Sequence, residues 1–312
     1  MMTNAMQTSP ELLELEGVTK LFTLKPMFGA TREVVALRDV TLTLKAGRAL
    51  AIVGESGSGK STLGRAVTRL FDLSGGAVRF KGQDIARLQS REEKLGYMRS
   101  VQMVFQDPFA ALNPAHTVRH HLQRPLQLHR GLTGKALDQA VRDALADVEL
   151  DVDVNIDKYP HELSGGQRQR VNLARAVAVG AELVVADEPT SMLDVSIRRS
   201  VLDLMRRMKT ERSISFLYIT HDIATAQYLA DDVAIMFAGR VVEWGAPADV
   251  IANPQHPYTQ LLLDAVPDPA VRLNESNGTG FAARADAIRE AARRDLQPPV
   301  EVSPGHFVRH NI

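Results

Sequence analysis

The sequence predicts an α/β fold, and three observations support this. Short apolar runs rich in Val, Ile and Leu alternate along the chain with segments of helical periodicity. The clearest run, residues 48–53, leads directly into a glycine-rich stretch. The composition is that of an ordinary globular protein, with 45% hydrophobic and 24% charged residues among 312. A chain of this length has room for about two domains, or for one large domain with appendages.

Charge and cysteine content exclude several classes of function. The 37 basic and 37 acidic side chains give a formal net charge of +0, so no general attraction to nucleic acid or anionic lipid is expected. The sequence has no cysteine, which excludes disulfides, iron–sulfur clusters and cysteine nucleophiles and favours the reducing cytosol. We expect no secretory signal, and the most apolar stretch, residues 174–186, is shorter than the about 20 residues of a membrane-spanning helix.

The expected elements of the first half begin with a strand at residues 41–44, where Leu alternates with Thr as in a strand with one covered face. Residues 48–53 follow as a buried strand. From about residue 107 to 174 the chain is predicted to be mainly helical, because apolar residues recur there at helical spacing (Leu137, Val141, Ala144, Leu145 and Val148).

The second half is predicted to hold two more buried strands, at residues 183–186 and 215–219, and then a β-hairpin that turns at Gly239 and Arg240. After Asn253 the composition changes, because prolines interrupt regular structure. Within this tail, residues 274–280 are typical of a flexible linker and residues 281–296 of a helix. We therefore predict a core domain over residues 1–252 and an extension over residues 253–312.

The strongest single motif follows the buried strand at residues 48–53 and matches the phosphate-binding pattern G-x-x-x-x-G-K-[ST]. Glycines let backbone N–H groups converge on phosphates, Lys60 adds a charge at the β and γ oxygens, and Ser61 offers a hard oxygen to Mg²⁺. A plain glycine turn is the alternative, and the position between a strand and a helix argues against it. The predicted ATP-binding residues here are Gly54, Glu55, Ser56, Gly57, Ser58, Gly59, Lys60, Ser61 and Thr62.

Two adjacent carboxylates end the predicted strand at residues 183–186. Asp187 is placed to face the metal, and Glu188 to polarise an attacking water. On its own this pair could be a solvated strand end. Downstream of a phosphate-binding loop, the pair predicts the second half of a nucleotide-hydrolysing site, with Lys60 and Glu188 among its catalytic groups.

Residues 163–170, Leu-Ser-Gly-Gly-Gln-Arg-Gln-Arg, resemble the signature motif of the ATP-binding cassette (ABC) proteins. The resemblance covers about residues 12–252 and implies a P-loop core of ABC type with an antiparallel β subdomain and a helical insert. It also implies roles for four single residues. Gln106 resembles the Q-loop glutamine, which acts in catalysis and at the metal, Asp194 belongs to the D-loop, His221 matches the catalytic switch histidine, and Phe22 matches an aromatic that stacks on adenine.

The same resemblance implies that two cassettes enclose two ATP molecules head to tail. The signature residues Ser164, Gly165, Gly166 and Gln167 of one cassette would then meet the γ-phosphate held by Lys60 of the other. A helix N-terminus after the Ser-Gly-Gly turn suits an anion. An isolated monomer is therefore expected to be nearly inactive.

Residues 253–262 and 302–308 resemble the C-terminal extension of ATPases that drive oligopeptide and dipeptide importers. We interpret His256 and Tyr258 as packing residues of this extension and not as catalytic groups. The importer branch implies two transmembrane permease subunits, a second ABC ATPase subunit, an extracytoplasmic substrate-binding protein and a peripheral position on the cytoplasmic face of the inner membrane. The solute stays open among dipeptides, oligopeptides, glutathione, nickel complexes, opine-like compounds and oligosaccharides.

Two other functions fit parts of the sequence. A soluble ABC ATPase of DNA repair or translation would usually carry a long coiled-coil insert or two cassettes in tandem, and this sequence has neither, nor a basic stripe for nucleic acid. A small-molecule P-loop kinase would have no use for residues 163–167. We therefore expect an importer ATPase with no nucleic-acid partner.

Overall fold

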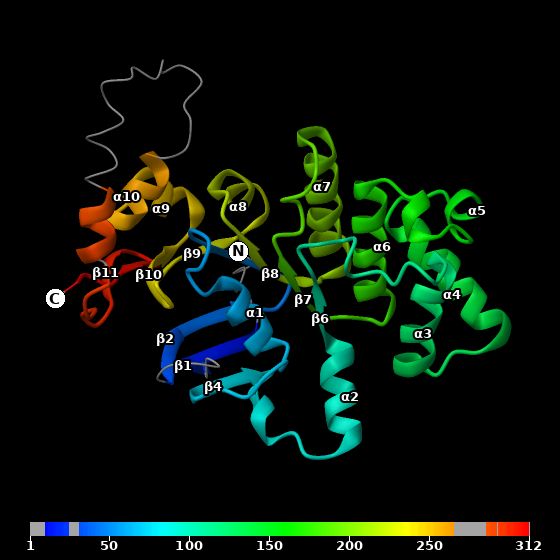
Figure 1. The fold of residues 1–312 in the computed structure, drawn as a ribbon, viewed down its shortest axis with the longest axis horizontal. Helices are drawn as coiled ribbons and strands as arrows, with labels where there is room; N and C mark the ends of the chain where they lie inside the picture. Colours follow the sequence, from blue (N-terminus) through cyan, green and yellow to red (C-terminus); the bar gives the residue numbers. More distant parts are fainter. Residues whose placement is uncertain (1–9, 25–30, 265–284, 292, 312) are drawn as a thin grey trace, which may run out of the picture.

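Two β-sheets and the helices packed on them make up the part of the chain that the structure describes (Figure 1). The structure is a computed structural model, and it describes residues 10–24, 31–264, 285–291 and 293–311. Sheets and helices alternate along the chain as expected, so the predicted α/β fold is confirmed.

The larger sheet has, within the described residues, eight strands in the order β11-β12-β10-β9-β3-β8-β7-β6. Five neighbours run parallel: β9 (Asp232–Phe237), β3 (Ala49–Val53), β8 (Ser215–Thr220), β7 (Leu183–Asp187) and β6 (Val101–Val104). The other three continue the sheet in antiparallel fashion: β10 (Arg240–Gly245), β12 (His306–Val308) and β11 (Val300–Ser303). Carboxyl ends of parallel strands meet at one edge, which is where ligands of such sheets bind.

The position of β3 inside the larger sheet explains why its sequence is apolar throughout. Successive side chains of a strand point to opposite faces. Ala49, Ala51 and Val53 join one hydrophobic cluster, and Leu50 and Ile52 join another. Helices cover both faces of the sheet: α6 (Gly165–Ala178), α7 (Val195–Arg212) and α8 (Ile223–Leu229) on one, and α1 (Lys60–Val67) on the other. A strand covered on both faces has no solvent side for polar residues.

The smaller sheet is antiparallel and has the strand order β2-β1-β4-β5 within the described residues. Its strands are β1 (Glu11–Leu24), β2 (Arg32–Lys45), β4 (Gly75–Phe80) and β5 (Gln83–Asp84). The predicted strand at residues 41–44 is the end of β2, with Leu42 and Leu44 buried and the two threonines exposed, as expected. A 3-10 turn (Ile85–Arg87) and α2 (Arg91–Ser100) lead from this sheet back to β6.

The helical insert extends from one end of the larger sheet (Figure 1). It consists of α3 (Val118–Arg130), α4 (Gly134–Asp147), the short α5 (Val152–Asn155), a 3-10 turn (Pro160–Glu162) and the beginning of α6. The prediction of a mainly helical segment over residues 107–174 is confirmed.

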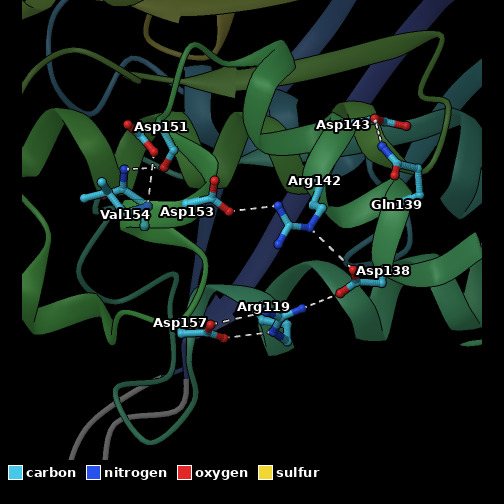
Figure 2. Close-up of polar contacts among 10 residues, drawn as sticks. Arg119, Asp138, Gln139, Arg142, Asp143, Asp151, Asp153, Val154 and Asp157 are labelled. Carbon is cyan, nitrogen blue, oxygen red and sulfur yellow. Dashed lines mark hydrogen bonds and ion pairs between the residues drawn. The ribbon is translucent and has the colours of Figure 1, made fainter. Parts of the chain in front are cut away.

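Ion pairs connect the elements of the insert (Figure 2). The Arg119 guanidinium on α3 donates to Asp138 on α4 and to Asp157 after α5. Arg142 on α4 lies 3.5 Å from Asp138 and 2.9 Å from Asp153 on α5. Two arginines therefore join three helices through three carboxylates.

The extension is packed into the larger sheet. Helix α9 (Pro247–Ala252) ends just before the predicted extension. Within the extension, α10 (Pro257–Asp264) and the helical residues 285–291 precede β11 and β12, which extend the sheet beyond β10. Tyr258, Leu261 and Ala285 belong to the same hydrophobic cluster as Ala49, Ala51 and Val53 of β3. The boundary at residue 252 stays a prediction. The predicted linker and residues 281–284 and 292 of the predicted helix lie outside the described residues. Of the other residues of that predicted helix, 285–291 are helical and 293–296 are not.

One predicted turn is displaced. Arg240 pairs with Phe237, so the two residues that join β9 to β10 are Ala238 and Gly239, and not Gly239 and Arg240. Both have positive φ, 46° and 80°. Two-residue hairpin turns need such angles. The prediction was wrong because it took glycine as the first residue of the turn, whereas Ala238 occupies that position.

Candidate functional site

A cavity of about 860 Å³ lies at the carboxyl ends of β3, β7 and β8. It brings together residues that are far apart in the sequence, since Gln106 follows β6, Glu188 follows β7 and His221 follows β8. The predicted site residues that line it are Glu55, Ser56, Gly57, Gly59, Lys60, Ser61, Thr62, Gln106, Glu188 and His221. Gly54 and Ser58 belong to the same loop, between β3 and α1.

Two glycines permit the tight fold of this loop. A Cβ on Gly54 would lie 2.1 Å from the Met236 carbonyl oxygen. Gly59 has a φ of +103°, and a Cβ there would lie 2.5 Å from the Ala36 carbonyl oxygen. Helix α1 then begins at Lys60, so its first N–H groups lie beside the cavity and favour a bound anion.

Lys60 is buried beneath the loop, with 4% of its surface exposed. Its ammonium group donates hydrogen bonds to the carbonyl oxygens of Gly54 and Glu55, both at 2.8 Å. Burial lowers the pKa of Lys60, while the carboxylates of Glu188 and Asp187 act in the opposite direction. The amine is therefore fixed at the cavity wall by backbone dipoles, in reach of phosphate oxygens.

The side chains of Ser61 and Asp187, both predicted to hold Mg²⁺, contact each other below the loop. The Ser61 hydroxyl donates to Asp187 Oδ1 at 3.0 Å, and burial raises the pKa of Asp187. A hydroxyl and a carboxylate side by side suit Mg²⁺, which prefers oxygen ligands and keeps several waters. No cage of three His, Cys, Asp or Glu side chains occurs in the described ranges. A cation here would therefore complete its shell with water and phosphate oxygens, as Mg²⁺ does beside nucleotides.

Glu188 is held by two other predicted residues. The Gln106 amide donates to Glu188 Oε2 at 3.1 Å, and His221 Nδ1 lies 3.3 Å from the same oxygen. Glu188 has a φ of +45°, which costs energy in a residue other than glycine, and its N–H donates to the Ile219 carbonyl at 2.9 Å. The fixed carboxylate faces the cavity and is suited to take a proton from water. Gln106, predicted also as a metal ligand, is thus bound to Glu188.

The signature residues lie away from this cavity. The Ser164 hydroxyl accepts the N–H of Gln167 at 3.3 Å, and the Gln167 side chain accepts the N–H of Ser164 at 2.9 Å, which caps the first turn of α6. Ser164, Gly165, Gly166, Gln167 and Asp194 are absent from the part of the cavity lining that the structure describes. The cavity and the predicted signature residues therefore lie on different parts of the surface of one chain.

Apolar side chains are exposed beside the signature motif. Met192, Val195 and Ile197 have exposed fractions of 55%, 81% and 40%. A Cβ on Gly166 would lie 2.4 Å from Ile197, so this patch adjoins the signature. Exposed apolar groups gathered next to a functional motif are typical of a protein interface.

Phe22 lies one strand away from the cavity. Its ring packs edge-on against Phe71 with 5.5 Å between the centroids, and it is outside the described lining. It pairs across β1 and β2 with Val34, which does line the cavity. The side chains of directly paired residues lie on the same face of the sheet, so Phe22 lies beside a residue of the cavity wall. Its contact with adenine stays a prediction.

The extension contributes lining residues that the sequence analysis missed as site residues. Tyr258, Leu261, Leu262 and Arg289 all line the cavity. The sequence singled out Tyr258 only as a packing residue, and it is indeed 1% exposed. Its position in the extension motif was the available signal, whereas nothing in the sequence around Arg289 indicates a role at this site.

His256 connects Tyr258 to the end of the chain. Its Nδ1 accepts the N–H of Tyr258 at 3.0 Å, and its Nε2 lies 3.1 Å from the Asn311 side-chain oxygen. The N–H of His256 donates to the buried carboxylate of Glu243, whose other oxygen contacts His306 at 2.7 Å. This polar network fixes Tyr258 from behind.

The network predicts a dependence of stability on pH. Burial lowers the pKa of His256 from its usual 6.5, and the neutral ring accepts a hydrogen bond at Nδ1. The unfolded chain takes up a proton near pH 6.5 that the folded chain refuses, so the free energy of unfolding falls as the pH drops below that value. In urea unfolding at pH 7.5 and 5.5, His256→Gln is expected to show a smaller difference between the two pH values than the parent. His161 is exposed, so His161→Gln should show the same difference in the free energy of unfolding between the two pH values as the parent. The same difference in both variants would contradict this role of His256.

Two known protein families match the sequence. The family described as ABC transporter matches residues 37–191. The family described as oligopeptide/dipeptide transporter, C-terminal region, matches residues 242–286, and this range begins eleven residues before the predicted extension.

Curated relatives match almost the whole chain. The oligopeptide transport ATP-binding protein AppF of Bacillus subtilis is 37% identical, over 95% of this chain and 96% of its own length. The oligopeptide transport ATP-binding protein OppF of Streptococcus mutans is 38% identical, over 96% of this chain and 94% of its own length.

Solved structures match the core. A dimeric post-hydrolysis state of an ATP-binding cassette bound to ADP and Pi has a TM-score of 0.67 and 27% identity, over 76% of this chain and 99% of that one. The structure of cbiO1 from Clostridium perfringens, part of the ABC transporter complex cbiONQ, has a TM-score of 0.66 and 28% identity, over 78% of this chain and 91% of that one.

Proposed function

Because this chain belongs to the ABC transporter family, as the ATP-binding subunit of a peptide import system, we propose that its cavity binds MgATP and that hydrolysis requires a second cassette. One observation carries the proposal. The cavity of a single chain collects the phosphate-binding loop, Gln106, Glu188 and His221, whereas Ser164 and Asp194 lie elsewhere on the surface. In a head-to-tail pair, the signature of one cassette would complete the cavity of the other.

In the proposed mechanism, the loop N–H groups and Lys60 bind the β- and γ-phosphates. Ser61 and Asp187 would hold Mg²⁺, which supplies positive charge against the phosphate oxygens. Glu188 orients the attacking water and accepts its proton, while Gln106 and His221 hold the carboxylate in place. Ser164 of the facing cassette clamps the γ-phosphate from the other side.

A second cavity of about 550 Å³ between α2 and α3 is proposed to receive a cytoplasmic helix of a permease subunit. It is lined by both apolar and cationic groups, including the exposed Met98 and Leu128 and the side chains of Arg124 and Arg175. Its β6 side leads to Gln106, two residues beyond the end of that strand, so a helix seated here would adjoin the segment that contacts Glu188.

The proposed complex contains two permease subunits, a second ATPase subunit, identical or paralogous, and an external substrate-binding protein. In the described ranges, no helix combines the length and apolarity needed to cross a membrane. We place the chain on the cytoplasmic face of the membrane, held by the permeases. The names of the relatives support peptides as the solute, and the other subunits make the choice among solutes. No observation favours a nucleic-acid machine or a kinase.

Replacement of Met98 and Leu128 by Asp is expected to abolish retention on detergent-solubilised permease subunits, because two carboxylates would enter an apolar part of the groove. The permease subunits of the same transporter would be tagged, and the amount of bound ATPase would be measured by pull-down. Val154→Asp, on α5 of the same insert and 55% exposed, is the matched control and should bind like the parent. Equal retention of the groove variant and the control would exclude the groove as the docking site.

A further inference from the structure

The second residue of the phosphate-binding loop, Glu55, is held by two side chains from the extension. The N–H of Glu55 donates to the Tyr258 hydroxyl at 3.0 Å. Arg289 Nε donates to Glu55 Oε2 at 3.1 Å. The loop is thus attached to α10 and to the helical residues 285–291, more than 200 positions along the chain.

The Tyr258 contact is part of a rigid structure. The side chain is 1% exposed, and its ring packs against Phe237 with 4.3 Å between the centroids. Burial raises the pKa of Tyr258 to about 12, so the hydroxyl stays neutral at physiological pH. His256 fixes the Tyr258 backbone, and Asn311 fixes His256. The backbone of Glu55 therefore rests on an anchor that is itself held in place.

The Arg289 contact concerns charge. Glu55 and Glu188 both line the cavity, and a triphosphate would bring more negative charge to the same space. The Glu55 carboxylate acts on Lys60, since it is one of the groups that oppose the lowering of the pKa of Lys60. Arg289 is the cation paired with Glu55, and their side chains are 41% and 35% exposed. Without this cation, Glu55 would repel an incoming phosphate chain.

We propose that Tyr258 and Arg289 are positioning residues of the nucleotide site, through which the extension sets the affinity for ATP. Tyr258 holds the loop backbone, and Arg289 cancels the charge of Glu55. This inference rests on the proposed function, because it assumes that the loop binds the triphosphate.

The test measures the dissociation constant of the full-length chain for the ATP analogue AMP-PNP with Mg²⁺, by isothermal titration calorimetry. Arg289→Gln is expected to weaken binding about 2- to 5-fold, which is the effect expected from the loss of one exposed ion pair. Glu55→Gln/Arg289→Gln should restore the parent affinity, because the unpaired charge is gone. The loss in Arg289→Gln should shrink when the salt rises from 50 to 500 mM. A merely structural role of Arg289 would give neither the rescue nor the salt dependence.

Tyr258→Phe removes only the hydroxyl and is expected to weaken binding about 2- to 10-fold, the value of one hydrogen bond to the loop. Arg293→Gln is the matched control, because Arg293 lies two positions after the helical residues 285–291 and forms an exposed ion pair with Glu290. It should bind like the parent.

The proposal is overturned if Arg289→Gln and Tyr258→Phe both bind like Arg293→Gln, or if the Glu55/Arg289 double variant stays as weak as Arg289→Gln. Lys60→Ala, measured in the same way, separates the two levels of inference. Retained affinity in Lys60→Ala would refute the nucleotide site itself. Lost affinity in Lys60→Ala together with parent affinity in Arg289→Gln and Tyr258→Phe would refute only the role of the extension.

Discussion

Replacement of Glu188 by Gln is expected to lower the rate of ATP hydrolysis about 10²–10⁴-fold, the usual cost of losing a general base. The amide keeps the shape of the side chain but no longer accepts a proton from water. Nucleotide binding should survive, because Lys60 and the loop are unchanged. Since the γ-phosphate would still be held from both sides, an ATP-bound cassette dimer should accumulate. Hydrolysis assays and size-exclusion chromatography with Mg²⁺ and ATP, using the partner cassette if the natural pair is unequal, measure both effects.

Asp187→Asn is the comparison for this experiment. Asp187 accepts the hydrogen bond of Ser61 below the loop, so its loss is expected to weaken the Mg²⁺ site and therefore binding as well as turnover. If Glu188→Gln hydrolyses ATP normally while Asp187→Asn alone is inactive, the roles assigned to these two carboxylates are wrong.

Replacement of Lys60 by Ala is expected to weaken nucleotide binding by about 10- to 100-fold and to reduce hydrolysis to background. A hydrogen bond to a charged group contributes about 1.5–3 kcal/mol, so the loss of one such bond between Lys60 and a phosphate corresponds to about this factor. The same change removes the two bonds from the ammonium group to the loop carbonyls. The melting temperature of the variant would therefore be measured beside its nucleotide affinity, to separate a loss of stability from a loss of binding.

Lys135→Ala, an exposed lysine on α4, serves as the control for loss of a positive charge and should bind nucleotide like the parent. An assembled Lys60→Ala variant that hydrolyses ATP at the parent rate would disprove the assignment of the phosphate-binding loop.

The fold was predictable where local sequence decides it. β3 is buried on both faces and is apolar at every position, so its pattern was unambiguous. The strand β2 alternates, because one face is covered. Helix α2 was not predicted, since it buries only Tyr97 and has almost no apolar stripe. The turn before Arg240 was misplaced because Ala238 adopts a conformation that propensity assigns to glycine.

The candidate site divides in the same way. The loop from Gly54 to Ser61 is contiguous, so a pattern of residue types was sufficient to find it. The contact of Glu188 with Gln106 and His221 depends on parallel strands that end together. The sequence pointed to each of these three residues but not to their contact. The contact of Arg289 with Glu55 joins residues 234 positions apart and follows from packing alone, which no local pattern encodes.

The ion pairs of the helical insert affect how far its helices can move independently of one another. Arg119 and Arg142 cross-link α3, α4 and α5, so a displacement of α3 is expected to carry α4 and α5 with it. Helix α3 lines the proposed groove and also contacts α6, which begins at the signature turn. The pairs are partly exposed and screened by salt, so mechanical coupling, more than ATP affinity, is the property that high ionic strength would loosen.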